Sequence, residues 1–195
     1  MQADAELWHA WQGGDQAAGG VLVERHFATV YRFFATKVPD AADDLTQATF
    51  TACVEAAEAF RAEASFRSFL LGIARLQLLR FFEGRGQLMG GRAVSEISLV
   101  DLMPSPFSAA AYSQQRAVLI EAMHKLPLDL QIVLELHYWE NLETQEVADV
   151  LGVPLGTAKS RLSRARTRLG DVLHKGRRAP GTTTVADELR AALDT

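Results

Sequence analysis

The stretch 143–169 constrains the fold of this chain more than any other, because it predicts two helices joined by a tight turn. Apolar residues recur at spacings of three and four on both sides of the turn, which gives each helix one apolar face. Gly152 supplies the backbone freedom that a sharp reversal needs, and Pro154 suits a turn or the first position of a new helix. The inward-facing residues of the second helix are predicted to be Leu155, Ala158, Leu162, Ala165 and Leu169.

The second of these helices is strongly basic, with five Lys or Arg side chains and no acid. A basic second helix after a short glycine-containing turn is typical of a helix-turn-helix, in which this helix enters the major groove of DNA. Arg can bond two acceptors on a guanine edge, while hydroxyl groups and backbone N–H groups at the helix start can hold phosphates. The alternative is an ordinary surface helix. At about 3.6 residues per turn, the outward side carries Thr157, Ser160, Arg161, Ser163, Arg164, Thr167 and Arg168, and the apolar face is flanked by Lys159 and Arg166.

Charges alternate in blocks along the chain, although the net charge is only −4. Residues 61–92 hold 2 acids and 6 bases, and residues 152–180 hold 1 acid and 8 bases. Residues 1–60 and 93–151 each hold 9 acids and are net acidic. The pattern indicates two anion-binding surfaces, each beside an acidic surface that can face another partner. The alternative is that these blocks are only solvated helix faces.

Composition places the chain among globular proteins, because 195 residues with 48% hydrophobic content can bury a sizeable core. No apolar run reaches the length of about 20 residues that a membrane span needs, and residues 1–16 lack the features of a signal peptide. Cys53 has no second cysteine to pair with and is expected to be a small core residue. We therefore expect a cytoplasmic protein.

The rest of the chain reads as helices and no strand. The fold class that we predict is all-α, with two small helical domains joined by a flexible linker, the second containing the helix-turn-helix. The linker, 84–113, is rich in Gly, Ser and Pro and has room for short helical pieces. The expected domains are 1–83 and 114–175, followed by an extension of unknown role, 176–195.

Helical periodicity predicts the remaining helices and their apolar faces. The helices are expected at 6–11, 17–38, 40–60, 66–82, 114–125, 129–139 and 185–193. The apolar face of 17–38 is expected to hold Val21, Leu22, Phe27, Val30, Tyr31 and Phe34. The apolar face of 40–60 is expected to hold Leu45, Ala48, Ala52, Ala56 and Ala59.

The first basic block interleaves arginines with phenylalanines between 60 and 82. Single-stranded nucleic acid binds such surfaces, because aromatic rings stack on bases and positive charges hold the backbone. The alternative is that the phenylalanines belong to the core, which fits most of them. Phe66 and Arg67, at the start of their helix, are the best candidates for exposure.

The sequence carries no pattern that indicates an enzyme. The five histidines are scattered, and none pairs with Cys, Asp or Glu at a metal-ligand spacing. Glycine-rich phosphate loops and GxSxG elbows are absent from the sequence. We therefore predict no catalytic residue, no metal and no cofactor.

Three stretches, taken in their order, carry a resemblance to a known family. They are DDLTQATF at 43–50, SFRSFLLGIAR at 65–75, and the whole of 126–169. Together they resemble bacterial RNA polymerase sigma factors of the extracytoplasmic-function (ECF) type, the compact two-domain branch. The third match is long and specific, whereas the first two depend on their order and spacing.

The resemblance implies partners and roles. The chain would bind core RNA polymerase through Asp43, Asp44 and Gln47, and its linker would thread toward the RNA exit path. An anti-sigma factor is a further implied partner. The promoter −10 element would be bound and opened by Arg61, Phe66, Arg67, Phe69, Arg75 and Arg80. The −35 element would be read as duplex DNA by Thr157, Lys159, Ser160, Arg161, Ser163 and Arg164.

The chain departs from the family's pattern in the −10 segment. It has Leu76 where Asn is common and Phe69 where Trp is common, and the arginines that usually follow this helix are few. These differences affect how the −10 element is recognised rather than the class of protein. Two other functions remain open: a helix-turn-helix regulator that acts without core polymerase, and an adaptor whose main partner is another protein.

Overall fold

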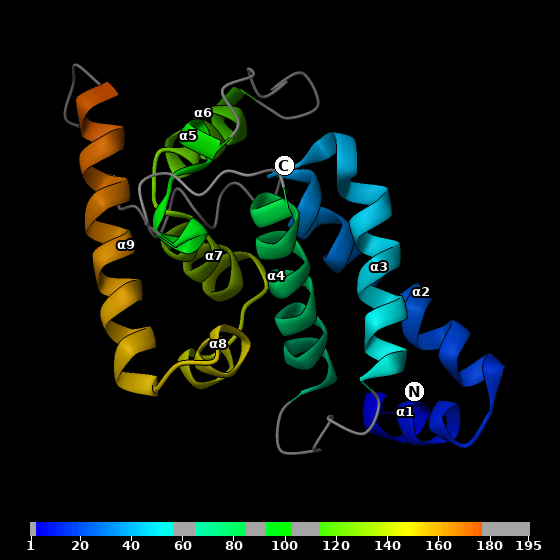
Figure 1. Ribbon diagram of the computed structural model, residues 1–195. Coiled ribbons are helices and arrows are strands. Elements are labelled where there is room, and N and C mark those ends of the chain that lie inside the picture. Colours follow the sequence, from blue (N-terminus) through cyan, green and yellow to red (C-terminus); the bar gives the residue numbers. More distant parts are fainter. Residues whose placement is uncertain (1–2, 57–64, 85–92, 103–113, 177–195) are drawn as a thin grey trace. The chain divides into compact units, whose positions relative to one another are not determined.

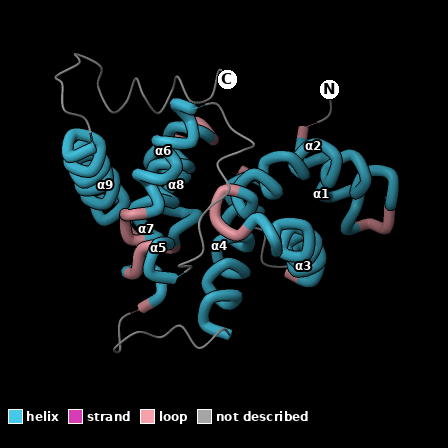
Figure 2. Tube along the Cα trace, turned by 90° about the horizontal axis from the view of Figure 1, so that it is seen from above, coloured by secondary structure: helices cyan, strands magenta, loops and turns pink. Residues whose placement is uncertain are grey.

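The computed structural model describes residues 3–56, 65–84, 93–102 and 114–176 (Figure 1). Within these ranges the chain forms helices and loops, without a strand (Figure 2). One isolated antiparallel bridge joins Ser98 to Pro127. The predicted all-α fold is confirmed. Among the described helices, none combines the length and apolar character that a membrane crossing requires.

The chain divides into two compact units. One comprises Met1–Phe81 with Asp149–Gly152, and the other comprises Phe82–Ala148 with Val153–Thr195. The division falls near the end of the first predicted domain and agrees with the expectation of two helical bodies. The expected helix at 185–193 lies outside the described residues.

The described part of the first unit contains four α-helices (Figure 1). Helix α1, Asp4–Gln12, packs on α2, Gln16–Ala35, and α2 packs on α3, Ala42–Glu55. A short 3-10 turn, Pro39–Ala41, leads into α3, and α4 covers Phe66–Gly84. Helix α2 begins sharply because the Asp15 side chain accepts hydrogen bonds from the N–H groups of Ala17, at 2.9 Å, and Ala18, at 3.1 Å.

The buried face of α2 is rotated relative to the predicted one. Leu22, Val30 and Phe34 are buried as expected. Three other predicted core residues are exposed, namely Val21, Phe27 and Tyr31. The buried positions follow one another at intervals of three or four residues, and this stripe is completed by Ala18, His26 and Phe33. The prediction was wrong because it counted the largest apolar residues and left His26 out. The rings of Phe27 and Tyr31 stack on each other instead, with centroids 6.0 Å apart.

Helix α3 also buries a different face from the predicted one. The buried residues are Ala42, Thr46, Thr49, Phe50 and Cys53. Of the predicted residues, Leu45, Ala48, Ala52 and Ala56 are half-buried, and Ala59 lies outside the described residues. The Thr49 hydroxyl can be buried because its Oγ1 donates to the carbonyl oxygen of Leu45 at 2.7 Å. Cys53 is fully buried, as expected. Burial raises the pKa of its thiol to about 12, so the thiol stays protonated and unreactive at neutral pH.

The second unit contains the rest of the described chain. Part of the predicted linker is packed, because Ile97, Leu99 and Leu102 are buried. The N–H of Leu128 donates to the carbonyl oxygen of Ile97 at 3.0 Å, which ties this segment to α7. The remaining elements are a 3-10 turn at Val94–Glu96, α5 at Leu99–Leu102, α6 at Gln114–His124, α7 at Leu128–Leu134, a π-helix at Glu135–Trp139, α8 at Thr144–Leu151 and α9 at Leu155–Gly176. The division assigns the end of α8, from Asp149 on, to the first unit.

The predicted helix-turn-helix is confirmed in α8 and α9. Gly152, between them, has φ +64°, a left-handed conformation that favours glycine. The N–H of Val153 donates to the carbonyl oxygen of Ala148 at 3.1 Å and closes the end of α8. Helix α9 packs on α7 and α6. Of its predicted inward residues Leu155 is half-buried, and the buried ones are Ala158, Leu162, Ala165 and Leu169.

Candidate nucleic-acid interface

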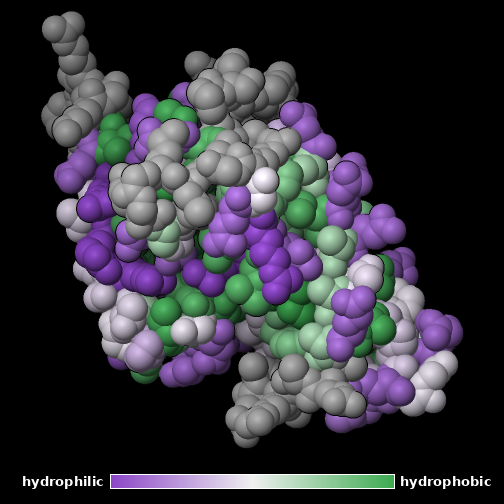
Figure 3. Space-filling model, viewed as in Figure 1, coloured by the Kyte–Doolittle hydropathy of each residue, from purple (hydrophilic) through white to green (hydrophobic). Residues whose placement is uncertain are grey.

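The outward face of α9 is polar and accessible. In Figure 3 strongly hydrophilic residues gather over this helix. Thr157 is half-buried in the first turn, and the other predicted contacts apart from Arg161 are exposed, namely Lys159, Ser160, Ser163 and Arg164. In the first turn, the N–H groups of Thr157 and Ala158 donate to the carbonyl oxygen of Pro154, at 2.8 Å and 3.1 Å, and so begin the helix. This arrangement can approach a DNA groove without rearranging the helix.

Arg161 differs from its neighbours because it has a partner inside the unit. One of its guanidinium nitrogens lies 2.6 Å from a carboxylate oxygen of Asp129 on α7. The two side chains expose only 23% and 10% of their surface. The ion pair therefore fastens α9 to α7. The sequence analysis did not anticipate this contact, because the two residues are far apart along the chain.

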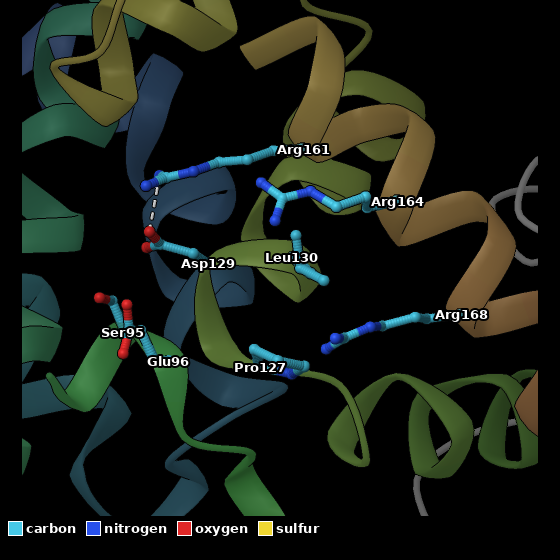
Figure 4. A pocket seen from close by; sticks show the side chains of 8 residues that line it. All are labelled: Ser95, Glu96, Pro127, Asp129, Leu130, Arg161, Arg164 and Arg168. Carbon is cyan, nitrogen blue, oxygen red and sulfur yellow. Dashed lines mark ion pairs between the residues drawn. The ribbon is translucent and has the colours of Figure 1, made fainter. Parts of the chain in front are cut away.

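A hollow of about 290 Å³ lies beside this ion pair (Figure 4). Arg161, Arg164 and Arg168 extend into it from α9, while Asp129 and Glu96 lie across from them. Carboxylates beside guanidiniums weaken the attraction of those guanidiniums for phosphates. The outward face of α9 thus borders acidic side chains from α7 and from the segment 93–102. The remaining lining residues are Ser95, Pro127 and Leu130.

Arg166 is exposed, but its guanidinium contacts side chains of the segment that follows α7. Its guanidinium carbon lies 5.5 Å from the ring centroid of Tyr138, in cation–π contact. A second contact of Arg166 is with His137. Its Nδ1 lies 3.0 Å from the carbonyl oxygen of Leu142 and must donate, since a carbonyl only accepts. Its Nε2 then accepts from the Arg166 guanidinium at 3.5 Å. Both aromatic residues lie in the π-helix that follows α7.

In the first unit, α4 starts with a side chain that was expected to be exposed but is buried. Phe66 exposes only 3% of its surface. Its ring centroid lies 5.2 Å from that of Trp8 and 5.4 Å from that of His26. The expectation was wrong because α1 and α2 cover this position, and the contacting residues Trp8 and His26 are 58 and 40 residues before Phe66 in the sequence. Phe66 is a core residue in this structure, not a free stacking surface.

The other predicted −10 residues do not share one face of α4. At about 100° per residue, Arg67 and Arg75 lie toward one side of the helix, and Phe69 and Arg80 lie toward the opposite side. Arg80 is exposed and the other three are half-buried. Arg61 lies outside the described residues. The described part of α4 thus offers a pair of arginines on one side and a ring with an arginine on the other.

The predicted polymerase contacts form one exposed cluster at the start of α3. Asp43, Asp44 and Gln47 are all exposed. The two carboxylates lie in the first turn, where the positive end of the helix dipole favours them. Asp43 and Gln47 are four residues apart and so lie on the same side of the helix. The cluster is accessible to a partner with basic side chains.

The described residues also hold an ionic cluster that the sequence analysis missed. Asp4 of α1 pairs with Arg25 of α2, and its second carboxylate oxygen lies 2.8 Å from Nε2 of His26. Burial lowers the pKa of His26 from its usual 6.5, against the opposing effect of Asp4. Within the described part of the chain, His, Cys, Asp and Glu side chains form no group of three that could hold a metal ion.

Comparisons with known proteins agree with these two units. Residues 22–87 match the family model of sigma-70 region 2, and residues 116–169 match that of sigma-70 region 4. RNA polymerase sigma factor NccH of Alcaligenes xylosoxydans xylosoxydans is 30% identical over 166 residues, which cover 82% of this chain and 89% of that protein. The ECF RNA polymerase sigma-E factor of Escherichia coli K12 is 26% identical over 178 residues, which cover 84% of this chain and 90% of that protein.

The fold is shared with a solved structure of CnrH in complex with the cytosolic domain of CnrY. The TM-score is 0.65 and the sequence identity is 24%, with 90% of this chain and 100% of that chain covered. The fold and these matches define a class, the sigma-70 family of transcription initiation factors, whose members are not enzymes. This chain belongs to its ECF branch. It is a sigma factor that directs promoter-specific transcription with core RNA polymerase.

Proposed function

We propose that the two units divide the recognition of a promoter between them. The first domain, 1–83, docks on core polymerase and binds the −10 element, and the second, 114–175, reads the −35 element as duplex DNA. Residues 84–113 connect them, and 176–195 are an extension. The observation that carries the proposal is the exposed outward face of α9, which has no acid between Leu155 and Leu169 and follows directly after the Gly152 turn, inside the region 4 match.

The −35 contacts that we propose are Thr157, Lys159, Ser160, Ser163 and Arg164. Arg164 is the best candidate for reading a base, because it is exposed and its guanidinium can bond two acceptors of one guanine. Arg161 has a different role in this proposal. It holds α9 against α7 through Asp129 and so orients the residues that touch DNA.

The −10 contacts that we propose are Arg67, Phe69, Arg75 and Arg80, together with Arg61. Phe69 is half-buried, which leaves part of its ring for a base, and the arginines supply charge for the single strand. Extruding a base costs a few kcal/mol, which stacking and hydrogen bonds in a pocket offset. Polymerase docking is assigned to Asp43, Asp44 and Gln47, which form the exposed acidic start of α3.

A protein regulator completes the proposal. CnrH is solved in complex with the cytosolic domain of another protein, CnrY. We propose that an anti-sigma factor or similar regulator likewise controls this chain. The sigma factor itself acts in the cytoplasm, where it works on core polymerase without a catalytic residue, metal or cofactor of its own.

The division of promoter recognition between the two units can be tested in a binding assay with four DNA templates. A promoter selected by the holoenzyme is compared with versions whose −35 element, −10 element or both are scrambled. We expect the Arg164→Ala holoenzyme to lose affinity only on templates with an intact −35 element. If it loses the same factor on every template, α9 contributes phosphate contacts and does not read the −35 element. Arg166→Ala is the matched control, since Arg166 packs against Tyr138.

A further inference from the structure

Helix α1 precedes the segment that matches the family model, which begins at residue 22, yet it is firmly packed. Leu7 and Trp8 expose only 3% and 1% of their surface. The indole of Trp11 lies directly over Gly19 of α2, where an added Cβ would come within 2.4 Å of the ring. Glycine at this position thus permits the close approach of the two helices. Helix α1 is therefore an integral, packed part of the first unit.

An ionic cluster fixes α1 at its other end. The Asp4 carboxylate bonds Arg25 and His26, two consecutive residues of α2. His26 exposes 6% of its surface and in turn contacts the ring of Phe66. The Asp4 carboxylate therefore influences α4 through His26, because it fixes the position of the imidazole that contacts the Phe66 ring.

Trp8 links α1 directly to the first turn of α4. Its ring centroid lies 5.2 Å from that of Phe66 and 6.3 Å from that of Phe69, in a tilted and an edge-on arrangement respectively. These separations are typical of aromatic pairs that stabilise each other. Phe69, the proposed stacking ring, is therefore held on one side by Trp8 while its half-buried ring keeps some exposed surface.

We propose that α1 is a positioning element for strand capture, with Trp8 and Asp4 as its positioning residues. The inference rests on the proposed binding of the −10 strand by α4. Trp8 holds the first turn of α4 in the conformation that receives the unpaired strand, and Asp4 holds α1 in place. A ring that is already ordered loses less conformational freedom when a base stacks on it, so preorganisation favours capture. Core binding and −35 recognition do not depend on α1.

The test follows promoter opening in the holoenzyme, with 2-aminopurine in the non-template strand of the −10 element. Trp8→Ala should reduce the amplitude or rate of the fluorescence rise by roughly three- to tenfold, while the affinity for core polymerase is unchanged. Trp8→Phe, which keeps a ring, should restore most of the signal. Phe33→Ala is the control for lost stability, because Phe33 is a buried ring on α2 two turns beyond His26.

Asp4→Asn provides a second test that does not depend on a large cavity, with Glu24→Gln, an exposed residue of α2, as its charge control. A slowed opening with Asp4→Asn and normal opening with Glu24→Gln supports the proposal. Normal opening in both Trp8→Ala and Asp4→Asn overturns it, as does an equal loss in Phe33→Ala at matched thermal stability. If the unmodified holoenzyme gives no fluorescence rise at an active promoter, the proposed −10 function fails instead.

Discussion

At the level of single residues, two arginines on α9 have different surroundings, so their substitution by alanine should affect different properties. Arg164→Ala should cost about 1–3 kcal/mol of promoter affinity and relax the base preference at one −35 position. Arg161→Ala leaves Asp129 partly buried without its ion pair, so it should lower the free energy of unfolding by about 1–3 kcal/mol. Urea unfolding and promoter binding, measured on both variants, separate the two effects.

The two variants should differ in which property they lose, stability or sequence preference. If Arg161→Ala keeps full stability but loses sequence preference, the ion pair with Asp129 is not its role and Arg161 reads a base. Asp129→Asn is the partner control, and it should destabilise the protein without removing a positive charge from the DNA face.

His26 gives the stability of the chain a defined pH dependence. Its pKa is lowered in the folded protein, mainly by burial, from the usual 6.5. Below pH 6.5 the unfolded chain binds a proton that the folded chain resists, so this contribution to stability is complete above pH 6.5 and falls as the pH drops toward the folded pKa. The unfolding free energy of the unmodified protein minus that of His26→Gln should therefore decrease between pH 7 and pH 5.

Urea unfolding at several pH values measures this difference. The control is His9→Gln, which removes an exposed histidine from the same unit. A difference that grows as the pH falls would contradict this expectation, because it would mean that Asp4 raises the His26 pKa by more than burial lowers it.

At the level of elements, α3 offers a clean test of polymerase docking. Asp44→Arg reverses a charge in the exposed first turn of α3 and should weaken core polymerase binding while leaving the thermal midpoint nearly unchanged. Fluorescence anisotropy with labelled protein and purified core measures the affinity. Glu55→Arg, at the far end of the same helix, makes the same charge change away from the cluster. Equal affinities for Asp44→Arg and the unmodified protein would remove this turn from the docking surface.

Local sequence signals were enough to predict the helix-turn-helix. Gly152, Pro154 and apolar spacing act within one turn of backbone, and each appears in the structure where it was expected. Contacts between distant segments were not predictable in this way. The burial of Phe66 depends on α1, and the pairing of Arg161 depends on Asp129, 32 residues earlier.

The face of α2 shows a different limit of sequence reasoning. Hydrophobicity favoured Phe27 and Tyr31, but the buried stripe passes through His26, whose polar ring is satisfied by Asp4. A polar residue can occupy the core when its partner comes from another helix, and a single sequence does not reveal that partner. For the same reason, Phe27 and Tyr31 were predicted to be core residues, whereas they form an exposed stacked pair.

At the level of the whole molecule, the charges explain why this chain needs polymerase. The net charge is −4, and acids line the hollow beside the arginines of α9. Phosphate contacts supply most of the affinity of DNA-binding proteins, and acids nearby reduce that term. A free chain of this kind should bind DNA weakly. When polymerase holds the chain in place, α9 needs to supply register and discrimination rather than the full affinity.

We propose that this chain gives core polymerase its promoter choice through two DNA contacts. The most direct measurement is run-off transcription with purified core polymerase and this protein across a promoter library. The account predicts initiation at promoters that share a −35 and a −10 element at fixed spacing, and loss of initiation when either element is scrambled. Transcription unchanged by addition of the protein, or initiation that depends on neither element, would contradict it.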